Sequence, residues 1–119
     1  MLSLRGNGRI VPKPWGQELI FAENDRYLGK KLYIKEGHSL SRQYHNIKDE
    51  TFLVQSGIMD LEIGDPEFLT IKRMDKGSVY RCRPLTIHRM VAVSDTIVIE
   101  VSSPEINDVI RLEDNYGRL

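Results

Sequence analysis

The sequence predicts an all-β, single-domain protein, a β-barrel or a double-stranded sandwich, over residues 1–119. Short segments rich in Ile, Val, Leu, Thr and aromatic residues recur through the whole chain. Turn residues separate these segments at intervals of about 8–12 residues, the spacing of sandwiches and barrels. No window of about 11 residues shows the apolar period of an amphipathic helix, so long helices are not expected.

Each expected strand is bounded by turn residues, since glycine, proline, aspartate and serine favour the backbone angles of tight turns. The expected strands are, in chain order, Gly16–Glu23, Tyr27–Lys35, Leu40–His45, Glu50–Gln55, Ile58–Ile63, Glu67–Lys72, Ser78–Arg81, Thr86–Val93 and Thr96–Ser102. The turns that separate them include Lys35–Gly37, Gln55–Gly57, Gly64–Pro66, Asp75–Gly77 and Ser94–Asp95. An N-terminal arm covers residues 1–12. The tail, residues 107–119, is either a last strand or a short helical turn.

Composition and charge exclude several classes of protein. Lys and Arg total 17, as do Asp and Glu, so the formal net charge is zero. A zero balance gives no electrostatic reason to expect nucleic acid or an anionic membrane as a partner. The longest apolar runs, Leu19–Ala22 and Met90–Val93, are far shorter than the ~20 residues of a membrane-spanning helix.

The single cysteine, Cys82, rules out a disulfide within the chain. Residues 1–6 contain no apolar stretch long enough for a signal peptide, so we expect a cytoplasmic protein. A small barrel leaves sheet edges that another chain can pair with. Since the net charge is zero, little repulsion opposes self-association. We therefore expect a homodimer in which the N-terminal arm covers a neighbour's sheet edge.

Polar residues with metal-binding side chains gather around one expected turn. Gln43 and His45 are two residues apart in a strand and leave its same face. The polar turn 46–49 then leads to Glu50, which begins the next strand. Antiparallel pairing of these two strands would bring Glu50 beside His45, and His88 would complete the set from a later strand.

Two nitrogen and two oxygen donors leave room for water or substrate on a bound ion, as in catalytic rather than structural metal sites. Such donors suit zinc, manganese, cobalt, nickel or iron. Zinc is the ion we expect first. A single strand histidine is more often a core or surface residue than a ligand, and it is the spacing of the set that favours ligation. His38 has the opposite parity to Gln43 and His45, so we expect it to face solvent in its turn.

The spacing itself is a motif. The pattern Gly37-x5-Gln43-x-His45-x4-Glu50-x6-Gly57 matches the first cupin motif, except that glutamine replaces its first histidine. A looser match to the second motif consists of Gly77, Pro84 and His88, with Thr86 where glycine is usual. The sequence therefore resembles the cupins, and this resemblance implies the cupin-type double-stranded β-helix, a jelly-roll barrel.

From about Pro12 to Arg118 the chain resembles the C-terminal cupin domain of type II mannose-6-phosphate isomerases. That domain is often fused to mannose-1-phosphate guanylyltransferase. The segments that carry the resemblance are Lys13–Gly16, Asp25–Tyr27 with Lys30, Gly37–His45, Glu50, Val54–Gly57, Ile87–Arg89, Ile99–Val101 and Asp108–Arg118. The Pro-Trp-Gly start, the glutamine at position 43 and the Glu-Asp-x-Tyr-Gly-Arg end make the match more specific than a cupin motif alone.

The resemblance implies a divalent metal held by Gln43, His45, Glu50 and His88. It also implies isomerisation of mannose 6-phosphate to fructose 6-phosphate. In this reaction the metal would hold O1 and O2 and stabilise an enediol-like intermediate. A proton must also move between C1 and C2, and the base is not assigned.

Several cations are candidates for the substrate phosphate or for the developing charge. We assign Arg111 and Lys48 to catalysis, and Lys31, Arg89 and Tyr116 to substrate binding. Arg89 directly follows a ligand, so in a regular strand it should point away from the metal. The Tyr116 ring is expected to pack the tail, with its hydroxyl free for a hydrogen bond. Trp15 is expected to anchor the N-terminal arm by packing rather than to stack on a sugar.

The chain departs from the family pattern beside the site. The family usually has further histidines and an arginine where this chain has Asn46, Ile47 and Lys48, and His-Trp where it has Thr51–Phe52. The segment between His88 and Asp108 is also shorter than usual.

An alternative function is therefore a non-catalytic metal-binding cupin module that binds a sugar phosphate or a sugar nucleotide. An iron oxygenase fits less well, because such cupins commonly use three histidines and a glutamate. Synthesis of GDP-mannose by these 119 residues is not expected.

Overall fold

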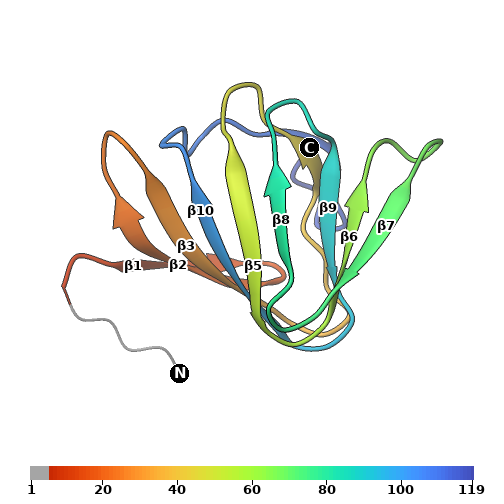
Figure 1. Ribbon diagram of the computed structural model, residues 1–119, viewed down its shortest axis with the longest axis horizontal. Helices are drawn as coiled ribbons and strands as arrows, with labels where there is room; N and C mark the ends of the chain where they lie inside the picture. The colour runs from red at the N-terminus through yellow and green to blue at the C-terminus, as the bar shows by residue number, and fades with distance from the viewer. Residues whose placement is uncertain (1–5) are drawn as a thin grey trace.

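The computed structural model describes residues 6–119, which form two antiparallel β-sheets that face each other (Figure 1). The strands in this part of the chain are β1 (Arg9–Lys13), β2 (Gly16–Glu23), β3 (Leu28–Ile34), β4 (Arg42–Tyr44), β5 (Glu50–Ser56), β6 (Met59–Ile63), β7 (Thr70–Met74), β8 (Val79–Cys82), β9 (His88–Ala92), β10 (Thr96–Ser102) and β11 (Ile110–Glu113). No helix within residues 6–119 is long and apolar enough to cross a membrane. The predicted all-β single domain is confirmed.

The strand order is that of a double-stranded β-helix. One sheet has six strands in the order β1-β2-β3-β10-β5-β8, and the other has five in the order β11-β4-β9-β6-β7. Strands that are distant in the chain thus become neighbours, as in the pairing of β3 with β10 and of β4 with β9. In Figure 1 the two sheets converge at the lower edge and diverge towards the upper edge.

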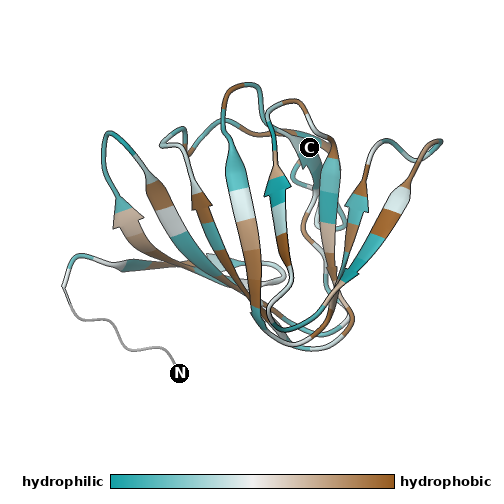
Figure 2. Ribbon diagram, in the orientation of Figure 1, coloured by the Kyte–Doolittle hydropathy of each residue, from teal (hydrophilic) through white to brown (hydrophobic). Residues whose placement is uncertain are grey.

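Buried apolar side chains from both sheets fill one end of the space between them. Hydrophobic and polar residues alternate along many of the strands (Figure 2), and the buried apolar side chains of both sheets point into the space between them. The main cluster consists of Trp15, Leu32, Ile34, Phe52, Val54, Met59, Leu61, Met74, Cys82, Met90, Ala92 and Val98. Burying such side chains stabilises the fold by roughly 1.5–3 kcal/mol for each large one.

Further along the same strands the inward positions become polar. On β3 the buried Lys30 precedes the core residue Leu32 by two positions, and on β10 the buried Glu100 follows Val98 by two positions. The six-stranded sheet also turns Glu18 and Glu50 inward. One end of the barrel is therefore an apolar core, and the other end is lined with buried charges.

The glycine that ends the first motif is required by its backbone. Gly57 lies between β5 and β6 with a φ of +86°, a left-handed conformation that L side chains rarely adopt. A Cβ at this position would also lie 2.2 Å from the carbonyl oxygen of Asp95. Any other residue here would displace the turn that joins the two sheets.

The predicted strands are found with small changes at their ends, and Gly16–Glu23 and Thr96–Ser102 keep the same bounds. One segment differs from expectation. Residues 9–12 of the expected N-terminal arm belong to the strand β1, which pairs with β2 of the same chain. The tail contains the strand β11, which pairs with β4, so the first of the two alternatives expected for the tail is found. Residues 1–5 of the expected arm lie outside the described residues.

Candidate functional site

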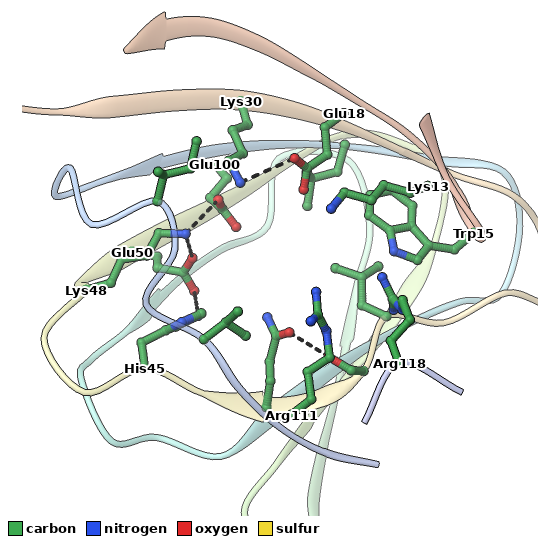
Figure 3. A pocket seen from close by; sticks show the side chains of 16 residues that line it. Lys13, Trp15, Glu18, Lys30, His45, Lys48, Glu50, Glu100, Arg111 and Arg118 are labelled. Atoms are coloured by element: carbon green, nitrogen blue, oxygen red, sulfur yellow. Dashed lines mark hydrogen bonds and ion pairs between the residues drawn. The ribbon is translucent and has the colours of Figure 1, made fainter. Parts of the chain in front are cut away.

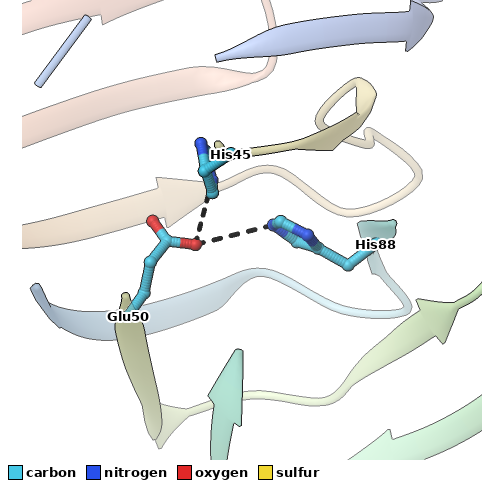
Figure 4. A group of neighbouring side chains, drawn as sticks. All are labelled: His45, Glu50 and His88. Atoms are coloured by element: carbon cyan, nitrogen blue, oxygen red, sulfur yellow. Dashed lines mark ion pairs between the residues drawn. The ribbon is translucent and has the colours of Figure 1, made fainter. Parts of the chain in front are cut away.

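Three of the predicted ligands meet in one small volume between the sheets (Figure 4). His45, Glu50 and His88 each offer one ligand atom, and these atoms all lie within 4.8 Å of one another. Oε2 of Glu50 is 3.1 Å from Nε2 of His45 and 3.6 Å from Nε2 of His88. All three side chains are buried. One carboxylate oxygen and two imidazole nitrogens therefore converge on a common point.

The route by which these residues meet differs from the predicted hairpin. The strands β4 and β5 do not pair with each other, because β4 lies in the five-stranded sheet and β5 in the six-stranded sheet. The turn 46–49 crosses from one sheet to the other, so His45 and Glu50 face each other across the barrel. The site consequently joins the two sheets rather than two neighbours in one sheet.

Both histidines are oriented by a backbone carbonyl. Nδ1–H of His45 donates to the carbonyl oxygen of Asp108, and Nδ1–H of His88 donates to that of Thr86 at 2.9 Å. In a neutral imidazole whose Nδ1 carries the proton, Nε2 keeps its lone pair. Both lone pairs are thus free beside Glu50, and a histidine held in this way is the usual form of a metal ligand.

The charges of the three groups depend on one another. Burial lowers the pKa of His88, which keeps this imidazole neutral. Burial also acts to lower the pKa of His45, but the adjacent Glu50 carboxylate and the Asp108 carbonyl outweigh it and raise the pKa above its usual value. Burial alone would raise the pKa of Glu50, yet His45 and Lys48 hold it well below its ordinary range. Glu50 is therefore an anion at neutral pH.

The residues present fit a divalent cation. Nε2 of His45 and Oε2 of Glu50 are both buried, and neither has a hydrogen-bond partner. Buried polar atoms left without partners are costly and rare, and a metal ion would satisfy both of these. Gln43 lies next to His88 across the β4–β9 pair, and its Oε1 accepts a 2.7 Å hydrogen bond from the Ser41 hydroxyl. The second lone pair of that oxygen can complete a nitrogen and oxygen donor set.

A pocket opens from this cluster along the polar end of the barrel (Figure 3). Its walls consist of Lys13, Trp15, Glu18, Lys30, Leu32, Leu40, Ser41, Gln43, His45, Lys48, Glu50, Glu100, Ile106, Val109, Arg111 and Arg118. His88 is not among these and lies behind His45 and Glu50.

Charged side chains in the pocket pair with one another. Nζ of Lys48 lies 2.9 Å from Oε1 of Glu50 and 3.6 Å from Oε2 of Glu100. Nζ of Lys30 lies 3.4 Å from Oε1 of Glu18. The pKa of Lys48 is raised because these carboxylates outweigh its burial, so its ammonium group stays charged. Burial next to Glu50 raises the pKa of Glu100.

Of the predicted substrate and catalytic residues, Lys48 and Arg111 line the pocket. Lys31 does not, because strand parity turns Lys30 inward instead. Arg89 points away from the metal cluster, as its place after His88 predicted, and its guanidinium donates to Leu40 and Asn115 rather than facing the pocket.

Tyr116 also differs from the substrate-binding role assigned to it. Its hydroxyl is hydrogen-bonded to Nδ1 of His38 at 2.8 Å, and the two rings are stacked. His38 is consequently half-buried rather than turned to solvent. Trp15 packs in the core, as expected, and its side chain also reaches the pocket wall.

Sequence reasoning missed several residues of the pocket. The alternation of buried residues could have identified Lys30 and Glu100, since each is two positions from a core residue of its strand. Lys13 and Arg118 lie in two segments that carry the family resemblance, but strand alternation does not place them in the pocket, because they come from opposite ends of the chain. The two meet only because β1 and the tail after β11 close the same end of the barrel.

Asp108 was also missed, and it connects the tail to the metal cluster. Its carboxylate accepts hydrogen bonds from the backbone N–H groups of Asn46, Ile47 and Lys48, at 2.7–3.0 Å. These three donors lower the pKa of Asp108 to about 2. The carbonyl oxygen of Asp108 also accepts the hydrogen bond from Nδ1–H of His45. Asp108 therefore fixes both the turn between the ligands and the orientation of one ligand.

The fold and the cluster define the class of this protein as a cupin. KdgF from Halomonas sp. has a similar structure, with a TM-score of 0.73 and 21% identity over 86% of this chain and 91% of that one. An RmlC-like cupin from Shewanella frigidimarina is similar over 86% and 88% of the two chains, with a TM-score of 0.72 and 17% identity. At these identities the likeness concerns the fold alone.

Within that class, the chain belongs to the family described as mannose-6-phosphate isomerase C-terminal, which matches residues 4–114. The mannose-1-phosphate guanylyltransferase of Escherichia coli K12 is 33% identical over 93% of this chain and 23% of its own length. The xanthan biosynthesis protein XanB of Xanthomonas campestris is 31% identical over 92% of this chain and 24% of its own length. The chain thus spans about a quarter of these curated relatives. The resemblance seen in the sequence is confirmed.

Proposed function

We propose that this cupin domain is a divalent-metal-dependent aldose–ketose isomerase that converts mannose 6-phosphate to fructose 6-phosphate. The observation that carries the proposal is the convergence of His45, Glu50 and His88 within 4.8 Å, behind a pocket lined with cations. Gln43 would complete the ligand set. Zinc is our first choice, and manganese, cobalt, nickel or iron would suit the same donors.

When bound, a divalent ion supplies Lewis acidity at two neighbouring sugar oxygens. The chain's own residues would supply the remaining requirements. The buried Lys48 ammonium keeps a positive charge next to the metal cluster and would stabilise negative charge on the sugar oxygens. Leu32, Leu40 and Val109 line the pocket and would exclude water from the intermediate.

Proton transfer between C1 and C2 needs a base that is not already a metal ligand. Glu100 lines the pocket, lies 3.6 Å from Lys48 and belongs to no predicted ligand set. Glu18 is the other such carboxylate on the wall, and it pairs with Lys30. We therefore assign the proton transfer to the carboxylate of Glu100, which would accept the proton from one carbon and return it to the other.

The test is turnover of mannose 6-phosphate by protein loaded with zinc, cobalt, nickel, manganese or iron. We expect fructose 6-phosphate to form with at least one ion, and Glu100→Gln to lose most of the turnover, at least 100-fold, while keeping its metal. Asp49→Asn, which alters an exposed carboxylate paired with Arg81, serves as the control and should leave turnover unchanged. Absence of turnover with every ion would contradict the isomerase proposal.

A second candidate function is a non-catalytic cupin module that binds a sugar phosphate or a sugar nucleotide. The Lys48–Glu50 contact of 2.9 Å favours it, because an ammonium group already balances the one charged ligand. Bound metal and saturable sugar-phosphate binding without turnover would support this function instead of the first.

We further propose that the chain is a homodimer. The outer face of the six-stranded sheet carries Ile99, Leu53 and Val79 side by side, and Val79 is 62% exposed. A zero net charge adds no repulsion between two copies of this face. Sedimentation should give a dimer that Val79→Lys dissociates, and a wild-type monomer at micromolar concentration would contradict this assembly.

A further inference from the structure

Charge is distributed unevenly along the pocket. At one end, which we call the metal end, lie His45, Glu50 and Lys48. Figure 3 shows Lys13 and Arg118 on the opposite side, near Trp15, with Arg111 facing them across the opening. We call the group of Lys13, Arg111 and Arg118 the cation end.

The carboxylates that line the pocket are already paired. Glu18 is bound by Lys30 at 3.4 Å, and Glu50 and Glu100 are bound by Lys48 at 2.9 and 3.6 Å. No carboxylate among residues 6–119 lies within ion-pair distance of Lys13 or Arg111.

Arg111 and Arg118 present their guanidinium groups differently. Nε of Arg111 is buried and has no hydrogen-bond partner. Arg118 is held by Asp114, whose carboxylate accepts from Nε at 2.9 Å and from Nη2 at 2.8 Å. Asp114 thereby fixes one guanidinium at the edge of the pocket, while Arg111 keeps donors that nothing in the described chain accepts.

The three cations are close enough to repel one another. Burial lowers the pKa of Lys13, and the charges of Lys30, Arg118 and Arg111 add to this effect against the opposing charge of Glu18. Like charges gathered in a partly buried place destabilise the fold unless an anion joins them. Asp114 already offsets the charge of Arg118, whereas Lys13 and Arg111 have no carboxylate of the described residues within ion-pair distance, so the arrangement has the electrostatics of a binding site for an anion.

We propose that Lys13, Arg111 and Arg118 form the subsite that binds the phosphate group of a phosphorylated sugar, with the sugar ring extending from there towards the metal end. This assignment rests on the proposed function of the pocket. A phosphate monoester carries a charge of about −1.5 to −2 at pH 7 and presents three acceptor oxygens. Guanidinium groups match such oxygens with two parallel N–H donors, and a lysine adds a compact charge.

The two ends would then select a substrate by two separate features. The cation end requires a terminal phosphate, and the metal end requires neighbouring sugar oxygens. A neutral hexose would satisfy one end only, and inorganic phosphate the other. A sugar nucleotide carries its charge on a diphosphate inside the molecule, so it presents no terminal phosphate to three converging cations.

The experiment measures binding of inorganic phosphate, mannose 6-phosphate, mannose and GDP-mannose to the full chain by calorimetry, alongside its thermal unfolding. Wild-type protein should bind both phosphate and mannose 6-phosphate and unfold at a higher temperature in their presence. Lys13→Gln and Arg111→Gln should each weaken phosphate binding about tenfold or more. Without ligand, both variants should be at least as stable as the wild type, because repulsion is relieved. Lys31→Gln, on the outer face of β3, is the matched control and should bind as the wild type does.

Unchanged phosphate binding by Lys13→Gln and Arg111→Gln would overturn the subsite, as would tighter binding of GDP-mannose than of mannose 6-phosphate. Measuring the metal content and the turnover of each variant distinguishes failure of the phosphate subsite from failure of the proposed isomerase function. If metal binds and the two variants lose phosphate while no ion supports turnover, the subsite stands and the isomerase does not. If the two variants turn over mannose 6-phosphate with an unchanged KM, the isomerase stands and the subsite does not.

Discussion

The two ends of the pocket are built in different ways. The metal end is made by β4, β5 and β9 and the turn 46–49, deep inside the barrel, and its charges neutralise one another. The cation end is made by the end of β1 and by the tail, and there Asp114 pairs with Arg118 while Lys13 and Arg111 have no carboxylate partner within residues 6–119. The first is fixed by buried ion pairs and by the hydrogen bonds of Asp108, whereas at the second Asp114 holds Arg118 by hydrogen bonds. A change at the metal end should therefore affect the whole fold, and a change at the cation end should affect binding.

The largest expected effect comes from Glu50→Gln. This change removes the one charged ligand and leaves Lys48 buried with only the more distant Glu100. Breaking a buried ion pair costs about 3–5 kcal/mol, so urea unfolding should show a large loss of stability together with loss of metal. Glu23→Gln, at an exposed pair with Arg9, should cost no more than about 1 kcal/mol. Equal losses from the two variants would mean that the metal end is not fixed by its buried charges.

Asp108→Ala tests whether the tail supports the metal end. Removing its carboxylate frees three backbone N–H groups of the turn 46–48 and loosens the carbonyl that orients His45. Changes of this kind around a metal ligand typically weaken metal binding by about 10–100-fold. Competition with a chelator should show such a loss while the protein stays folded. Asp49→Ala, in the same turn but paired with exposed Arg81, should keep the wild-type affinity.

Acid should release the metal before it detaches the tail. Because the pKa of His45 is raised in the folded protein, protonation of His45 stabilises the metal-free fold below pH 6.5. This stabilisation is lost as the pH rises through the pKa that His45 has in the folded protein. Metal needs the neutral imidazole, so affinity should fall as pH drops, by about tenfold per pH unit for each ligand protonated.

The tail responds at much lower pH. Asp108 and Asp114 have pKa values lowered to about 2 from 3.8, so their contribution is present above pH 3.8 and is lost as pH falls towards 2. Backbone amide exchange of residues 46–48 should stay slow at pH 5, where the metal is already released. Loss of metal and of amide protection at one and the same pH would contradict this order.

The smallest expected effect is that of Tyr116→Phe. It removes a hydrogen bond of 2.8 Å to His38 in a half-buried place, which costs about 1 kcal/mol. Metal and phosphate affinity should not change, because the Tyr116 side chain does not line the pocket. His38→Ala should cost a similar amount, and the double variant should cost less than the sum. A selective loss of mannose 6-phosphate binding in Tyr116→Phe would restore its substrate-binding role.

The sequence predicted the site correctly where the position of a side chain depends on a single strand. The spacing of Gln43, His45 and Glu50 indicated a shared site, and parity turned Arg89 away from it. It did not predict which separate segments of the chain lie next to one another. The turn 46–49 does not reveal that β4 and β5 belong to different sheets. A short polar turn can join two paired strands of a hairpin as well as two strands of different sheets. The gathering of Lys13 with Arg111 depends on how β1 and the tail close the barrel, which no local pattern encodes.

Metal analysis of purified variants tests most directly whether Gln43, His45, Glu50 and His88 form one metal site. Wild-type protein should hold about one divalent ion per chain. His45→Ala and His88→Ala should lose most of it, because the remaining donors bind weakly. His38→Ala should keep the wild-type content, since His38 is bonded to Tyr116 away from the site. Equal metal retention by His45→Ala and His38→Ala would contradict the site.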